Sequence, residues 1–213
     1  HNLINTIIRI GEVFTKLFSN NKFNYLYINF YKQKYRYKFN DNSLIKQINT
    51  QLNKDIQKDD NKALNLIPII KLLDFEEFSI IYKKSLYKRI LIGRTSYLFE
   101  KLVYCYMKQN QLYSNSLNIM VNDICKGSLS FKNNIVIGTK GAWPINTNIS
   151  KTPKSFNNCK NEIDKKYKEE YPNRNLYWNN SSINAIIKFK EYEIQIGGIY
   201  VDFLNYFNEN DSI

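Results

Sequence analysis

The sequence has 213 residues but only one histidine, seven glycines and four prolines, and each shortage excludes a class of protein. The histidine is His1, the first residue, and a chain terminus does not hold an imidazole rigidly. The sequence therefore excludes Ser–His–Asp and Cys–His catalytic sites as well as histidine-based zinc motifs. No GxxxxGK[ST] or GxGxxG phosphate-binding motif occurs. Glycine and proline are too scarce for a collagen-like or low-complexity chain. We therefore expect a protein that is not an enzyme and that uses no cofactor.

The three cysteines also exclude common sites. Cys105, Cys125 and Cys159 are 20 and 34 residues apart, which is neither a CxxC metal pair nor an even-numbered disulfide framework. Reduced thiols are typical of the cytoplasm or the nucleus, where we expect the protein to act. No apolar run approaches the roughly 20 residues that span a bilayer, so we expect no membrane partner. The chain starts without a signal peptide and without Met, which predicts a fragment of a longer protein.

Acidic residues are scarce relative to basic ones: 31 Lys and Arg face 19 Asp and Glu, for a net charge of +12. Bases alternate with aromatic residues in YKQKYRYK (31–38), a pattern that can bind nucleic acid by stacking. However, Lys, Asn, Ile and Tyr are the residues that AT-rich codons specify, and no RRM, KH or zinc-finger signature occurs. A nucleic-acid partner is therefore the alternative, as in a basic ribosomal protein of an AT-rich genome, and not our leading hypothesis.

Hydrophobic residues make up 43% of the chain, enough for a real core. Apolar residues at three- and four-residue spacings predict a bundle of helices in the first part of the chain. Asp74 is the expected N-cap of one of them, and Gly127 is expected to end the last. The expected helices cover roughly 7–18, 43–52, 64–73, 74–88, 96–110 and 112–126.

The periodicity changes after Gly127. A polar helix is expected over 157–170, and period-two alternation then predicts strands over 174–179, 182–189 and 192–196, the last two joined by a tight turn at Lys190 and Glu191. A final helix follows from Tyr200. The fold class is therefore α+β: a multi-helix bundle (1–130) followed by a small α+β subdomain with an antiparallel or mixed sheet (131–213).

Three groups of motifs match the pattern of a known family. The first is FEEFSIIYKKSLYKRILIGRTS (75–96), and the second is LNIMVNDI (117–124) with Met120 and Asp123. The third combines GAWPI (141–145), NRNLYWNN (173–180) and YEIQIGGIYVDFLNYFN (192–208). In this order they resemble the cullin homology region of cullin-RING ubiquitin ligase scaffolds, over essentially the whole chain. The stretch between Glu100 and Met120 is about two residues shorter than the usual pattern, and Tyr200 stands near a position where the family commonly has Gln. The cullin-like subunit of the anaphase-promoting complex shares this region and remains an alternative.

The resemblance implies a non-catalytic scaffold for ubiquitin-dependent protein degradation. In the family, the sheet accepts a strand from a RING-box zinc protein, and that protein recruits the ubiquitin-conjugating enzyme. Zinc therefore belongs to the partner, and the family's ubiquitin-like modification lysine lies beyond this chain. The expected RING-subunit-binding residues are Trp143, Leu176, Trp178, Ile187, Phe189 and Ile194. Core roles for the two tryptophans remain an alternative that does not exclude partner binding.

Overall fold

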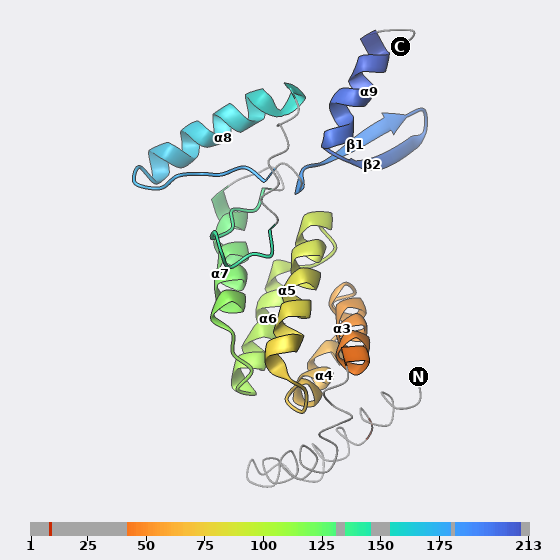
Figure 1. Cartoon of the computed structure of the whole chain (residues 1–213), viewed down its shortest axis with the longest axis vertical. Coiled ribbons are helices and arrows are strands. Elements are labelled where there is room, and N and C mark those ends of the chain that lie inside the picture. Colours follow the sequence, from red (N-terminus) through yellow and green to blue (C-terminus); the bar gives the residue numbers. More distant parts are fainter. Residues whose placement is uncertain (1–8, 10–41, 131–134, 146–153, 180–181, 210–213) are drawn as a thin grey trace. The chain divides into compact units, whose positions relative to one another are not determined.

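The computed structural model describes residues 9, 42–130, 135–145, 154–179 and 182–209 (Figure 1). The helix expected over 7–18, apart from Arg9, and the basic stretch 31–38 lie outside these residues. The described part contains seven α-helices, one 3-10 helix and a two-stranded antiparallel sheet, which agrees with the α+β class. The chain divides into two compact units, His1–Pro144 and Ile145–Ile213.

The first unit contains five described helices. They are α3 (Asn42–Ile56), α4 (Lys62–Ile70), α5 (Phe75–Ile92), α6 (Tyr97–Gln109) and α7 (Asn115–Ser130). Helix α3 packs on α4 and α5, and α6 packs on α4 and α7. Apolar side chains from all five helices fill the core, among them Ile48, Leu66, Leu86, Met107 and Met120, each no more than 1% exposed. These helices therefore share one hydrophobic core.

Helix α5 illustrates how the sequence sets an element. Oδ1 of Asp74 accepts hydrogen bonds from the backbone N–H groups of Glu76 (2.9 Å) and Glu77 (3.2 Å), which confirms Asp74 as the N-cap. The helix ends at Gly93, whose φ of 65° is left-handed and therefore suits glycine. Between these ends, Phe78, Tyr82 and Leu86 lie on one buried face.

The end of α7 differs from the expectation. Gly127 does not end α7, which continues to Ser130. Because the segment that follows α7 is bonded back onto that helix through Asp123, the division between the units falls after Pro144 and not near residue 130.

The second unit contains η1 (Lys154–Phe156), α8 (Asn157–Glu170), β1 (Asn184–Phe189), β2 (Tyr192–Gly197) and α9 (Ile199–Glu209). The strands form the expected hairpin, and Lys190 in its turn has a left-handed φ of 54°. The carboxylate of Asp202 accepts the backbone N–H of Lys154 at 3.1 Å and 3.2 Å, so the first turn of α9 is tied to the start of η1. Gly198 lies between hairpin and helix, where a Cβ would come within 2.6 Å of Ile183 Cγ2.

The strand expected over 174–179 does not form: these residues are extended, but they pair with no strand of the described chain. Leu176 and Trp178 are half-buried, whereas Tyr177 between them is 74% exposed. The indole Nε1 of Trp178 donates to Oδ1 of Asp164 on α8 at 2.8 Å. The segment therefore alternates covered and exposed side chains as a strand does, although its backbone is not paired with another strand. Alternation in a sequence indicates which side chains are covered and does not indicate whether the backbone is paired.

Candidate partner-binding surface

The β1–β2 hairpin carries three of the six expected partner-binding residues. Ile187 pairs with Ile194, and Phe189 pairs with Tyr192. Directly opposite residues of an antiparallel pair lie on the same face, so these four positions form one apolar face of the hairpin. The face is incompletely covered, because Ile194 is 48% exposed and Tyr192 70% exposed. The hairpin thus brings Ile187, Phe189 and Ile194 together.

Helix α9 adds aromatic surface that sequence reasoning missed. Tyr200, Phe203, Leu204, Tyr206 and Phe207 are each between 39% and 60% exposed. The rings of Phe203 and Phe207 are edge to face with centroids 5.0 Å apart. The i, i+3, i+4, i+7 spacing of Tyr200, Phe203, Leu204 and Phe207 indicates a helix and does not show whether its apolar stripe is exposed. The signal that could have revealed the surface is Tyr206, because an aromatic residue outside that stripe leaves few polar positions on this helix.

The second unit buries few side chains of its own. Among its described residues, the apolar side chains that are at least nine-tenths buried are those of Ile163 and Tyr167, both on α8. Two-stranded hairpins are marginally stable in water unless a helix or further strands cover an apolar face. The hairpin and α9 therefore form an exposed apolar surface of the described chain.

The hairpin also offers backbone hydrogen-bonding groups. Within the described residues, β1 and β2 pair with each other and with no third strand. Each strand thus has an outer edge of N–H and C=O groups that can pair with a strand from another chain. Unpaired edges next to an exposed apolar face are the two requirements for β-augmentation.

Of the two tryptophans, Trp178 belongs to the second unit, where it and Leu176 lie in the extended segment beside α8. Trp143 lies in the first unit and is 7% exposed. Its Nε1 donates to Oδ2 of Asp123 at 2.9 Å, and its ring meets Tyr87 edge-on, with centroids 6.3 Å apart. Trp143 therefore has a core role in the first unit, whereas the hairpin residues belong to the second unit.

Asp123 anchors the loop that carries Trp143. Its carboxylate also accepts the backbone N–H of Thr139 at 2.7 Å and the Thr139 hydroxyl at 3.1 Å. Gly138 lets the indole lie against the backbone, because a Cβ there would be 2.6 Å from Trp143 Nε1. Two of the motifs in the sequence, Met-x-x-Asp and Trp-Pro, are thus joined by a hydrogen bond.

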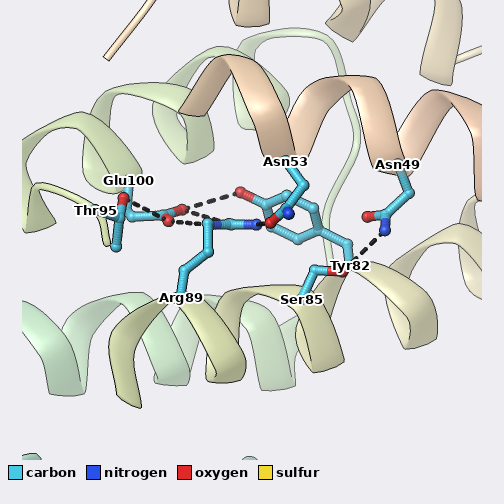
Figure 2. A network of polar contacts seen from close by, with 7 residues as sticks. All are labelled: Asn49, Asn53, Tyr82, Ser85, Arg89, Thr95 and Glu100. Carbon is cyan, nitrogen blue, oxygen red and sulfur yellow. Dashed lines mark hydrogen bonds and ion pairs between the residues drawn. The ribbon is translucent and has the colours of Figure 1, made fainter. Parts of the chain in front are cut away.

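A buried polar network occupies the first unit (Figure 2). Arg89 of α5 and Glu100 of α6 are each 1% exposed, and Arg89 Nε lies 2.6 Å from Glu100 Oε1. Arg89 Nη2 donates to Glu100 Oε2 at 2.9 Å, and Nη1 donates to Oδ1 of Asn53 on α3 at 2.6 Å. The hydroxyls of Tyr82 (3.2 Å) and Thr95 (2.9 Å) also donate to Glu100. The network thus links three helices.

The electrostatics of this network fit a fixed structural pair. Burial, and next the Glu100 carboxylate, raises the pKa of Tyr82 above its ordinary value. Burial opposes the charge of Arg89, but Tyr82 and Glu100 outweigh it and raise the pKa of Arg89. Tyr82 therefore keeps its proton and Arg89 its charge near neutral pH, and both are hydrogen-bonded to Glu100. Such an arrangement holds the helices together.

Metal-binding clusters and membrane-spanning helices are absent from the described residues. In this part of the chain, no cluster of three or more His, Cys, Asp or Glu side chains could hold a metal ion. None of the helices in the described ranges combines the length and the apolar character that crossing a bilayer requires.

No protein-family model matches the chain, and a search of curated proteins finds no significant match.

Proposed function

We propose that this chain is a non-catalytic scaffold segment of a cullin-RING type ubiquitin ligase. In this proposal the β1–β2 hairpin receives a strand from a RING-box zinc protein, and the RING protein in turn recruits the ubiquitin-conjugating enzyme. The observation that carries the proposal is the hairpin itself. Within the described residues, it combines unpaired edges with an apolar face on which Ile194 is 48% exposed and Tyr192 is 70% exposed.

The placement of the motif residues supports the same proposal. In the first motif, Phe78, Tyr82, Leu86 and Arg89 are all at most 1% exposed, so the spacing that suggested the family is a helix face turned into a core. The second and third motifs meet where Asp123 binds the Trp143 indole. Contacts between motif residues are expected where the motifs belong to one fold.

The charge of the chain fits a recruiting role. A net charge of +12 attracts acidic segments of a conjugating enzyme and raises the rate of encounter. Such steering is screened by salt, whereas strand addition and apolar burial are not. Rate and stability of the assembly are therefore expected to respond differently to salt.

The test is co-expression with a RING-box protein followed by size-exclusion chromatography at about 0.5 M salt, where surface charge is screened. The expected result is a stoichiometric complex. Ile194→Asp should abolish co-elution, because it places a charge on the apolar face of β2. Gln195→Asp is the matched control: it puts the same carboxylate one residue along, on the opposite face, and should leave the complex intact.

Two results would contradict the proposal. One is a folded chain that elutes alone at every salt concentration. The other is equal loss of the complex in both variants, because strand addition on one apolar face distinguishes them. If the chain instead shifted with RNA at low salt only, a nucleic-acid-binding protein would be the better description.

A further inference from the structure

An open hollow lies at one end of the first unit and is independent of the hairpin. It has a volume of about 540 Å³ and is lined by Lys54, Gln57, Lys58 and Arg94. Lys54 is in the last turn of α3, Gln57 and Lys58 directly follow that helix, and Arg94 follows Gly93 at the end of α5. Three cations from two chain segments therefore surround one concavity of a size that holds small ligands.

These three cations have no ion-pair partner among the described residues. The acidic groups near Lys58 are Asp55, which is 7% exposed and accepts a hydrogen bond from Gln51, and Asp60, whose carboxylate pairs with Lys62 at 3.3 Å. Among the described residues, no carboxylate lines the hollow itself. A helix C-terminus favours a nearby cation, which accounts for one cation at each end. This effect does not account for three cations around one hollow, because the cations repel one another.

The buried network fixes the two segments that carry these cations. Asn53, the neighbour of Lys54, accepts from Arg89 at 2.6 Å, and Figure 2 shows these two side chains meeting between α3 and α5. The backbone N–H of Arg94 donates to the carbonyl of Arg89 at 3.0 Å. One buried arginine thus ties both walls of the hollow together, so the backbone positions of Lys54 and Arg94 are set before any ligand arrives.

We propose that this hollow binds a compact, multiply charged phosphate compound. Arginine offers a planar set of donors for two phosphate oxygens, and lysines supply point charges from the opposite wall. An amide, Gln57, adds a neutral donor. Cations gathered around one concavity suit a compact anion, whereas a nucleic-acid strand needs a row of cations along its length. The first unit would then carry a small-molecule site besides any role in assembly.

The experiment is isothermal titration of the whole chain with tripolyphosphate, in low salt and again in physiological salt. We expect saturable 1:1 binding that weakens at least tenfold in the triple variant K54Q/K58Q/R94Q. The matched control K84Q/K88Q/K101Q removes three exposed lysines of α5 and α6, and hence the same net charge. Its affinity should stay within about threefold of the unmodified chain. All six side chains are exposed, so circular dichroism should show an unchanged fold.

Three results would overturn the proposal. The first is equal weakening in both triple variants, which would mean attraction to net charge alone. The second is a titration without saturation at about 1 mM ligand. The third is a single-stranded RNA that binds more tightly than tripolyphosphate and loses affinity equally in both variants, which would indicate a dispersed nucleic-acid surface.

Discussion

Replacing Glu100 by glutamine keeps the shape of a side chain that is 1% exposed and removes its charge. The structure predicts a large effect, because this carboxylate accepts four hydrogen bonds, two from Arg89 and one each from Tyr82 and Thr95. Glu100→Gln leaves the Arg89 guanidinium buried without its counter-ion. Breaking a buried pair in this way costs about 3–5 kcal/mol, a large part of the 5–15 kcal/mol that stabilises a typical domain.

The double variant Arg89→Leu/Glu100→Leu sharpens the prediction. It removes both charges, so the main remaining penalty is the lost partner of the buried Tyr82 hydroxyl, about 1–3 kcal/mol, because the half-buried Thr95 and Asn53 can bind water instead. The double variant should therefore be no less stable than Glu100→Gln alone. A simple sum of independent effects would predict the opposite order.

The assay uses the positions of the two tryptophans. In a Trp178→Phe background, Trp143 is the remaining tryptophan and reports on the first unit alone during urea unfolding. The exposed Glu76→Gln is the control and should change the free energy of unfolding by less than about 1 kcal/mol. The reasoning is refuted if Glu100→Gln changes it as little as this control, or if the effects of the two single leucine substitutions simply add.

Two further predictions concern the same unit. Gly138→Ala should cost about 1–3 kcal/mol and shift the emission of Trp143 to longer wavelength, because the new Cβ would be 2.6 Å from the indole Nε1; unchanged emission would contradict the close approach. Burial, with smaller effects from Tyr113 and Cys105, raises the pKa of Tyr104 from 10.0 to about 12, and its hydroxyl has no hydrogen-bond partner in the described part of the chain. The folded state holds the hydroxyl proton of Tyr104 more tightly than the unfolded chain does, so this group does not lower the free energy of unfolding below about pH 10. Above that pH, the group lowers the free energy of unfolding by up to about 1.4 kcal/mol per pH unit. Tyr104→Phe should therefore be neutral or slightly stabilising near pH 8 and should lessen the loss near pH 11 in urea titrations; parallel pH profiles would refute this.

Local signals predicted much of the fold. Asp74 followed by an apolar stripe defines α5, and alternating residues around Lys190 define the hairpin, because caps, helix periodicity and strand alternation are written in neighbouring residues. The extended segment at 174–179 shows the limit of such signals. Its alternation is correct, but whether its backbone pairs depends on α8, which supplies Asp164 to Trp178.

The polar parts of the structure were less accessible to prediction. Glu100 lies among apolar residues of α6, and nothing near it in sequence shows that its charge is buried. Its partner Arg89 precedes it by 11 residues, across a helix end and a turn, so their meeting depends on how α5 and α6 pack. The cations of the hollow come together for the same reason, since Lys54 and Arg94 are 40 residues apart. Among the expected binding residues, the common face of Ile187, Phe189 and Ile194 could be predicted because a tight turn fixes the register of the hairpin. The placement of Trp143 could not be predicted, because it depends on which unit its loop joins.

The unequal cores of the two units have a consequence for motion. The amide hydrogens of α3 and α5 are covered by side chains such as Ile45, Ile48 and Leu86, each at most 1% exposed, so they exchange with solvent only when the first unit opens as a whole. Among the described residues, the hairpin and α9 have no comparable cover, so we expect their amides to exchange through small local openings. Exchange is therefore expected to be slow in the first unit and fast in the hairpin and α9, where a bound partner would slow it.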